Sequence, residues 1–237
     1  MIVVYTFLEY LPNNYCLYLT INYTFGYTKL VIQNEEFINY LKELFPTAYC
    51  ELKFNSTYEL LIAVILSAQC TDRRVNMVTK ELFKKYNTPE QFALMPLEQL
   101  EQEIKSCGFY HNKAKHIKQA SESIINNFNG QVPTNYDDLL SLAGVGRKTA
   151  NVVSAVAYKA NVIAVDTHVL RVSNRLGFTK SQNPNICERD LVKRFKNNLD
   201  DLHYRMVLFG RYYCKAQKPL CETCKLKTNC KYYQKTS

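Results

Sequence analysis

Four cysteines near the C-terminus constrain the fold of this chain more than any other feature. They lie in the stretch CKAQKPLCETCKLKTNC, with the spacing C-x6-C-x2-C-x5-C, at Cys214, Cys221, Cys224 and Cys230. Four thiolates this close together can hold one tetrahedral zinc ion or one iron–sulfur cluster, and the spacing leaves both open. The loop between the first two cysteines would carry Lys215 and Lys218 toward solvent, where they could meet phosphate groups.

The other five cysteines favour a reducing compartment. They are scattered along the chain, some of them within apolar runs: Cys16, Cys50, Cys70, Cys107 and Cys187. Together with the cluster they make an odd total of nine. A disulfide framework would favour an even number at regular spacing, so we expect reduced thiols.

The spacing of apolar residues predicts an all-α fold. In NEEFINYLKELF, one helical face carries Phe37, Leu41 and Leu44. The stretch YELLIAVILSAQ is apolar on every side, as expected of a helix buried in a core. No alternating strand pattern of convincing length appears. With 237 residues, 47% of them hydrophobic, the chain can bury the core of one domain or of two small ones.

Capping residues mark the expected ends of several helices. Asn34 and Thr134 are expected to cap helix N-termini through their side chains. Gly108 is expected to end a helix in the left-handed conformation that glycine adopts without steric cost.

Residues 1 to 30 differ in composition from the rest of the chain. Their only charged residues are Glu9 and Lys29. The basic start and cleavage site of a signal peptide are absent, and Pro12 and several asparagines interrupt any apolar span. We therefore expect an extension outside the main fold and no membrane association.

The charge of the chain favours a polyanionic partner. The formal net charge is +9, and the C-terminal part is more basic still, with eight Lys or Arg from Arg205 onward against one acid, Glu222. Nucleic acid is favoured over a membrane surface, although charge alone is weak evidence.

The segment LLSLAGVGRKTANVVSAVAY predicts a helix, a tight turn and a second helix. Gly144 and Gly146 flank Val145 in the turn, and the second helix begins near Arg147. The first amide N–H groups of that helix would point into the turn and form a site that suits a DNA phosphate. The pattern is weak by itself, because two glycines before a helix often mark only a turn.

Lys148 lies in the first turn of that second helix. An isolated lysine there would ordinarily be a solvated surface residue, whereas a nucleophilic role needs a lowered pKa. The helix N-terminus contributes only about 0.3–1 kcal/mol, so burial near a substrate and the charge of Arg147 would have to supply the rest. Asp166 opens a later helix, in AVDTHVLRVSNRLGF, where it can cap the helix and also face a cleft.

Taken together, these stretches resemble the endonuclease III family of the helix-hairpin-helix DNA glycosylase superfamily. The matching stretches are ELLIAVILSAQCTD, LAGVGRKTANVV, AVDTHVLRVSNRLGF and the four-cysteine spacing, in the order of the family. They cover residues 33 to about 232.

The resemblance implies a two-domain helix-hairpin-helix DNA glycosylase fold. A six-helix barrel would span 51–160, with the helix-hairpin-helix at 136–158. Segments 31–50 and 161–237 would form a second domain that holds a [4Fe-4S] cluster on the four cysteines. Damaged double-stranded DNA would lie in the groove between the domains.

The resemblance also implies a bifunctional DNA N-glycosylase and abasic-site lyase acting on oxidised pyrimidines. Lys148 matches the nucleophile of the family, whose amine attacks the sugar C1′ of a flipped nucleotide and forms a Schiff base before β-elimination. Asp166 matches the catalytic carboxylate. Gln69 and Phe109 would fill or wedge the gap left by the flipped base. Residues that would contact DNA or line the pocket are Gly144, Val145, Gly146, Arg147 and His168. We expect a cytoplasmic monomer, associated with the nucleoid in a bacterium.

The chain departs from the family pattern at three positions. Ala143 stands where proline is usual, Phe109 where leucine is common, and His111 where asparagine is common. The histidines form no metal pattern, and His111, His116 and His203 are expected to be structural.

Two other functions compete with this interpretation. A mismatch-specific adenine glycosylase of the same superfamily shares the hairpin and the cluster, but it lacks a lysine at the position of Lys148 and carries a further C-terminal domain. A non-catalytic DNA-binding protein would need the hairpin and the cysteine loop, but no carboxylate at Asp166.

Overall fold

A computed structural model describes residues 5–10, 16–21 and 32–236 of the chain. The chain divides into two compact units, Met1–Val31 and Ile32–Ser237. In the first unit, β1 (Tyr5–Tyr10) and β2 (Cys16–Ile21) pair antiparallel, with Tyr5 opposite Ile21. The sequence analysis missed these strands, although both segments are rich in the aromatic and branched residues that favour strands. The expectation that 1–30 forms an extension falls largely outside the described residues.

The second unit is helical from Ile32 onward, as the apolar spacing predicts. Its α-helices in chain order are α1 (Asn34–Leu44), α2 (Thr57–Ser67), α3 (Asp72–Lys85), α4 (Pro89–Leu94), α5 (Leu97–Ile104), α6 (Tyr110–Phe128), α7 (Tyr136–Ser141), α8 (Arg147–Tyr158), α9 (Thr167–Leu176), α10 (Pro184–Phe195), α11 (Leu199–Leu208) and α12 (Tyr233–Thr236). A π-helix, η1 (Phe209–Tyr213), continues α11, and a short 3-10 helix, η2 (Lys227–Asn229), lies in the cysteine loop.

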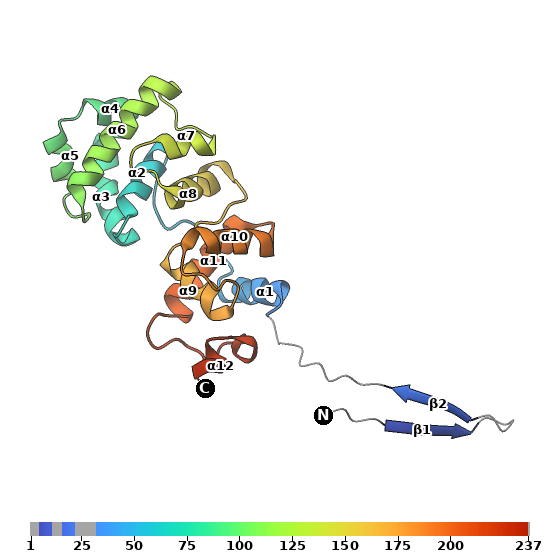
Figure 1. The fold of residues 1–237 in the computed structure, drawn as a ribbon. Helices are drawn as coiled ribbons and strands as arrows, with labels where there is room; N and C mark the ends of the chain where they lie inside the picture. The colour runs from blue at the N-terminus through green and yellow to red at the C-terminus, as the bar shows by residue number, and fades with distance from the viewer. Residues whose placement is uncertain (1–4, 11–15, 22–31, 237) are drawn as a thin grey trace. The chain divides into compact units, whose positions relative to one another are not determined.

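The first hydrophobic core of this unit forms around α2. Every residue from Tyr58 to Leu66 is buried, which explains why this helix is apolar on all sides. Helices α3, α6 and α8 contact it, and Figure 1 shows α2 to α8 gathered as one group. The buried residues of this core lie between Leu52 and Val153.

A second hydrophobic core joins α1 to the C-terminal helices. Phe37 of α1 packs edge-on against Phe178 with ring centroids 4.9 Å apart, and Phe178 packs against Phe195 at 5.4 Å. In Figure 1, α1 accordingly lies beside α11 and α9, which follow it far along the chain. Ile32, Tyr40 and Leu41 also belong to this core, and its other buried residues lie between Ile163 and Leu226.

Three predicted helix ends differ in the structure. Asn34 is the first helical residue, and its side chain donates to the Arg194 carbonyl (2.8 Å) instead of capping. Asn135, not Thr134, caps α7 by accepting from the Asp137 N–H (2.8 Å). Gly108 is not left-handed, because α5 already ends at Ile104 and the left-handed turn falls on the next residue, Phe109.

The expectations about disulfide bonds and membrane spans can be compared with the described residues. The eight cysteines from Cys50 to Cys230 are free thiols, and Cys107 and Cys187 are fully buried. No helix among these residues has the length and apolar character needed to cross a bilayer.

Candidate functional site

A cleft of about 1640 Å³ runs along the second unit, and four of the predicted site residues line it. Lys148 reaches it from the first turn of α8, and Asp166 and His168 reach it from the start of α9. Gln69 lines it from the turn after α2. The structure therefore brings together residues that are separated by up to about a hundred positions in the sequence.

The turn before α8 uses its two glycines differently. Gly144 has φ +77°, and a Cβ added to it would lie 2.8 Å from the Cβ of His116. Gly146 has φ −88°, and a Cβ there would meet nothing within 4 Å. Val145 between them is 6% exposed and belongs to the first core. The predicted DNA contact at Val145 can therefore involve only its backbone.

Helix α8 begins at Arg147, as the sequence predicts. Lys148, the next residue, is exposed to solvent in the cleft. Arg147 instead forms a two-point ion pair with Glu188 of α10, with Nε and Nη2 at 2.8 Å and 2.7 Å from the carboxylate oxygens. This pair raises the pKa of Arg147 and directs its guanidinium toward α10. The sequence pattern gave no sign of this partner.

Asp166 is held in place as the N-cap of α9. Its Oδ1 accepts a hydrogen bond from the Val169 N–H at 2.8 Å. Its other oxygen has no hydrogen-bond partner among the described residues, and no ion pair joins it to Lys148 there. The carboxylate is thus fixed by one oxygen while the other remains available to the cleft.

His168 is half-buried beside Asp166. Burial is the main reason that its pKa lies below the usual histidine value, and the charge of Asp166 opposes this shift. Its Nδ1 lies 3.2 Å from Nη2 of Arg171. Gly210 of η1 packs under it so closely that an added Cβ would lie 2.8 Å from the His168 Cβ.

Gln69 and Phe109 form a pair of exposed, left-handed residues. Their φ values are +52° and +58°, and the Phe109 side chain is 66% exposed. The two turns are neighbours, because the Gln69 carbonyl lies 4.0 Å from the position of an added Cβ on Gly108. Positive φ is uncommon outside glycine and costs about 1–3 kcal/mol, and such strain concentrates at functional sites.

The four predicted metal-binding cysteines line one small cavity. Cys214, Cys221, Cys224 and Cys230 surround it together with apolar side chains such as Phe209 and Leu176. Burial raises the pKa of the first three. Arg175 donates to the Cys214 sulfur at 3.4 Å. Among the described residues no three His, Cys, Asp or Glu side chains form a group that could hold a metal ion. Four thiolates are nevertheless the usual donor set of an iron–sulfur cluster.

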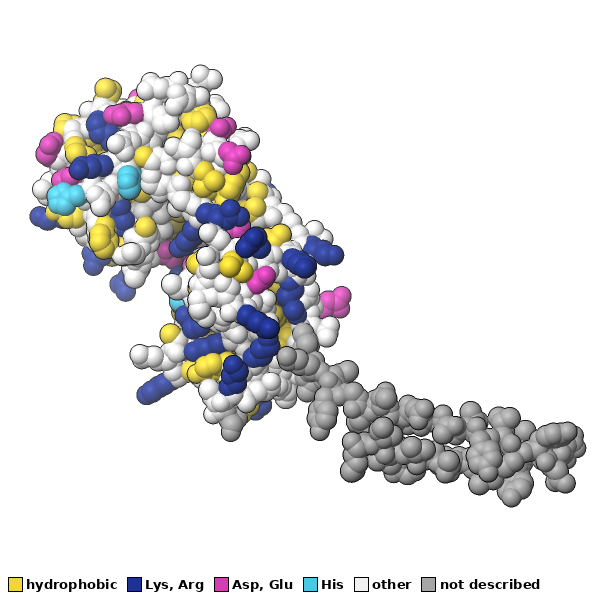
Figure 2. All heavy atoms as spheres, viewed as in Figure 1, with side chains coloured by type: hydrophobic (Ala, Val, Ile, Leu, Met, Phe, Trp, Pro, Cys, Tyr) yellow, Lys and Arg dark blue, Asp and Glu magenta, His cyan; other side chains and the backbone are white. Residues whose placement is uncertain are grey.

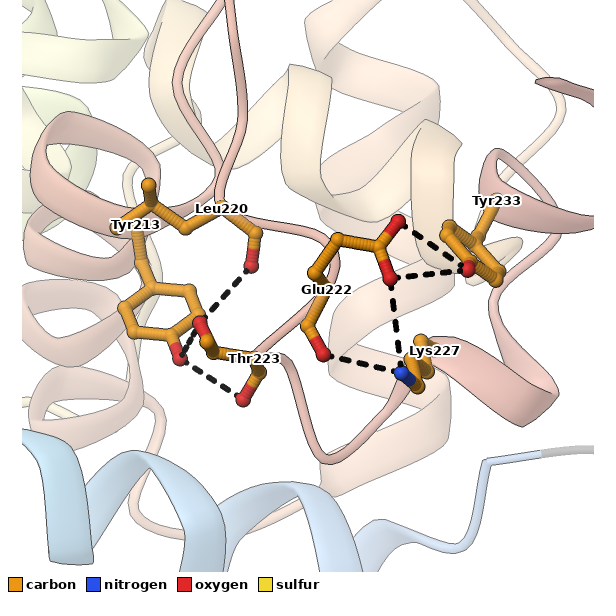
Figure 3. Close-up of polar contacts among 6 residues, drawn as sticks. All are labelled: Tyr213, Leu220, Glu222, Thr223, Lys227 and Tyr233. Atoms are coloured by element: carbon orange, nitrogen blue, oxygen red, sulfur yellow. Dashed lines mark hydrogen bonds and ion pairs between the residues drawn. The ribbon is translucent and has the colours of Figure 1, made fainter. Parts of the chain in front are cut away.

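The cysteine loop is also held by its own polar contacts (Figure 3). The Tyr213 hydroxyl lies 2.8 Å from the hydroxyl of Thr223. Lys227 donates to the Glu222 carbonyl at 3.0 Å. Between Cys214 and Cys221, the Lys215 carbonyl accepts a hydrogen bond from Arg175 (2.7 Å), and the Lys218 side chain is exposed.

A second, inner cavity of about 180 Å³ shares Lys148 and Asp166 with the cleft. His203 of α11 lies in its wall and is 6% exposed. Arg211 of η1 lines both spaces and pairs with Asp72 (3.1 Å) and Glu51. The sequence led us to expect a structural role for His203 and gave no expectation for Arg211, because neither lies in a motif and only the fold brings them to this cavity.

Basic side chains outnumber acidic ones over the C-terminal helices. On the face in Figure 2, Lys and Arg gather over the part of the second unit that carries α9 to α12, with few Asp or Glu between them. Such a surface suits a polyanion.

Comparisons with known proteins agree with this geometry. The model of the HhH-GPD superfamily of base excision DNA repair proteins matches residues 62–197. Endonuclease III of Bacillus subtilis (strain 168) is 48% identical over 205 residues, which cover 86% of this chain and 94% of that protein.

Two solved structures are similar over the same part of the chain. One is a trapped endonuclease III–DNA covalent intermediate, an estranged-adenine complex, at 48% identity. The other is a non-covalent endonuclease III–DNA complex, at 47% identity. Each has a TM-score of 0.81, and the match covers 86% of this chain and 99% of the other.

Proposed function

The chain belongs to the HhH-GPD superfamily of base excision DNA repair proteins and to its endonuclease III family, and we propose that its function follows from that membership. It is a bifunctional DNA N-glycosylase and abasic-site lyase. It excises oxidised pyrimidine bases from duplex DNA and cleaves the strand by β-elimination through a lysine Schiff base. The observation that carries this function is the placement of Lys148 and Asp166 in one cleft, in a chain 48% identical to a protein trapped covalently on DNA.

We propose that Lys148 is the nucleophile. Its amine attacks C1′ of the damaged nucleotide, the C1′–N bond breaks, and the base leaves with a proton. The sugar ring then opens to a Schiff base on Lys148, and loss of a C2′ proton expels the 3′-phosphate. Asp166, fixed by its cap, stabilises the positive charge that develops on the sugar.

We propose that the turn before α8 binds the DNA backbone. The bare surface of Gly146 lets a phosphate approach the amide groups at the start of α8. Gln69 and Phe109 enter the duplex at the flipped base, which their exposure and strained backbones support. His168 lines the pocket, and Lys215 and Lys218 contact phosphates from the cysteine loop.

We propose that the four cysteines hold a [4Fe-4S] cluster. Their common cavity, its apolar walls and the Arg175 donor support this cofactor. When bound, the cluster ties the four cysteines together. Arg175 holds the backbone of the loop that carries Lys215 and Lys218, through the Lys215 and Ala216 carbonyls, and Tyr213 holds Thr223 in the next part of the cysteine loop.

Metal analysis tests the cofactor. We expect about four iron and four sulfide per chain, and less iron in Cys221→Ser, because a cluster of this type needs four thiolates. Zinc at about one per chain, without sulfide, would contradict the proposal. Cys187→Ser, which changes a buried thiol outside the loop, should keep the iron of the parent.

We also propose the domain boundaries and the setting. The two hydrophobic cores support a barrel domain at 51–160 and a cluster domain built from 31–50 and 161–237. The protein acts as a monomer on damaged chromosomal DNA in the cytoplasm, where its free thiols remain reduced.

Borohydride trapping tests the function. The protein is mixed with duplex DNA that carries one oxidised pyrimidine, and a covalent protein–DNA band is measured. We expect a band from the parent, none from Lys148→Ala, and at least about 100-fold slower trapping from Asp166→Asn, as for loss of a key electrostatic contact. Lys159→Ala, at the other end of α8, serves as the control and should trap like the parent. Trapping by Lys148→Ala at the parental rate would contradict the assignment.

A further inference from the structure

His203 is a buried histidine with an unpaired ring nitrogen. Its Nδ1 has no hydrogen-bond partner among the described residues. The Ala164 backbone also acts on the ring and raises its pKa. Nδ1 can accept a hydrogen bond when the ring is neutral and carries its proton on the other nitrogen. An unsatisfied buried polar atom costs about 1–3 kcal/mol, so this nitrogen calls for a partner that the protein itself does not supply.

Two charged groups act on His203, and both belong to the proposed reaction. The negative charge of Asp166 raises the pKa of His203, and the positive charge of Lys148 lowers it. Burial is the largest influence and holds the pKa below the usual histidine value. His203 is therefore neutral at neutral pH, and its Nδ1 remains open to a partner.

The space between these groups is large enough for water. His203, Asp166 and Lys148 all line the inner cavity of about 180 Å³. A buried water needs two to four polar partners and far less room than this. Lys148 can donate to such a water, and Asp166 and His203 can accept from it.

We propose that His203 is a positioning residue that accepts, through water in the inner cavity, the proton that the Lys148 ammonium must lose before it attacks the sugar. This inference rests on the proposed Schiff-base reaction. The proton leaves Nζ and ends on Nδ1, which gives a neutral amine and an imidazolium, and no other bond changes. Once Lys148 is neutral, its repulsion of the imidazolium disappears while the attraction of Asp166 remains.

The other titratable groups of the inner cavity are less suited to this role. They come from the segment before α2, from the start of α3 and from α11 and η1: Tyr49, Cys50, Glu51, Asp72, Tyr204 and Arg211. Glu51 and Asp72 are both paired with Arg211. Burial raises the pKa of the Cys50 thiol and of the Tyr204 hydroxyl, which keeps both protonated at neutral pH.

The test compares the rate of Schiff-base formation across pH. His203→Gln keeps an amide donor for Ala164 but has no nitrogen that can take up a proton. Single-turnover borohydride trapping on a duplex with a preformed abasic site is measured from pH 6.5 to pH 9.5. At pH 7 we expect the variant to be about 10- to 100-fold slower than the parent, at the lower end of general-base contributions. At pH 9.5 we expect it to fall within about 2-fold, because hydroxide in solution can then take up the proton in place of His203.

Control variants separate this role from a structural one. Tyr204→Phe changes a polar group in the same cavity and should follow the parent at every pH. His203→Asn repeats the test with a shorter amide. A parental rate in both His203 variants at pH 7, or a loss that stays constant up to pH 9.5, would overturn the proposal. An absence of any adduct from the parent itself would overturn the proposed function instead.

Discussion

At the residue scale, the two glycines of the turn before α8 have different physical reasons to be there. Gly144 is required by the fold, because its φ of +77° and the 2.8 Å approach to His116 both exclude a side chain. Gly146 is required by neither its backbone nor its neighbours. A residue without a side chain at this position lets another molecule approach the backbone closely. A DNA phosphate at the start of α8 is such a molecule.

Alanine substitution should separate these two roles. Gly144→Ala should lower the free energy of unfolding by about 1–3 kcal/mol, because it combines left-handed strain with a clash. Gly146→Ala should change it by less than about 1 kcal/mol, the small difference between glycine and alanine at an N-cap, yet weaken binding to an abasic-site duplex. Thermal unfolding and a DNA titration measure both. Unweakened binding by Gly146→Ala would show that this surface does not meet DNA.

Single residues were predictable from sequence only where a motif fixes them locally. Lys148 and Asp166 reach the cleft because a helix start sets the direction of each. The burial of Val145 and the left-handed backbone of Phe109 depend on packing between distant segments. No local sequence pattern could therefore predict them. His203 shows the same limit, since only the packing of α11 against α9 brings it to the inner cavity.

At the element scale, the Arg147–Glu188 pair fastens the start of α8 to α10. Glu188 is 12% exposed and Arg147 is 48% exposed at the side chain, so the pair lies at the edge of the protein. A pair this exposed contributes little stability, about 0–1 kcal/mol. Its main consequence is to withhold the charge of Arg147 from a phosphate bound at the turn.

Glu188→Gln should therefore strengthen DNA binding. Without the carboxylate, Arg147 can turn to a phosphate, and the slope of log K against log salt should steepen by about 0.9, the value for one added phosphate contact. Binding is measured over a salt series. Glu103→Gln, which removes the partner of Lys85 on α5, is the matched control for net charge. An equal gain in the control would mean that only total charge matters.

Helices were predictable from apolar spacing, whereas the exact ends and the β-hairpin were not. The continuous apolar run of α2 and the face of α1 are periodic signals that tertiary packing reinforces. Cap positions shifted by one residue at Asn135, because asparagine and threonine compete for the same role. Strands β1 and β2 lack clean alternation, so the period gave no signal there.

At the scale of the whole molecule, the second core is formed by the first helix of the second unit together with the C-terminal helices. Ile32 is 1% exposed, and its carbonyl accepts a hydrogen bond from Arg194. Phe37 and Leu41 of α1 are fully buried against C-terminal helices. The second unit therefore begins at Ile32, while 1–31 form a separate compact unit.

Truncations on either side of this boundary should differ in their effect on stability. Removal of 1–31 should leave the unfolding temperature nearly unchanged and the trapping rate within about 2-fold of the parent, because both described hydrophobic cores consist of residues from Ile32 onward. Removal of 1–32 should cost roughly 2–4 kcal/mol, since Ile32 leaves a cavity in the second core. Thermal unfolding and borohydride trapping measure both effects. Loss of activity on removal of 1–31 alone would give that unit a role in the reaction.

The most direct test of the central claim identifies the residue that carries the DNA. The borohydride-trapped adduct is digested with nuclease and trypsin, and the modified peptide is mapped by mass spectrometry. Because trypsin does not cut after a modified lysine, we expect the sugar remnant on a peptide running from Lys148 to Lys159. The same remnant on any other lysine, or on the N-terminal amine, would contradict the account of Lys148 as the nucleophile.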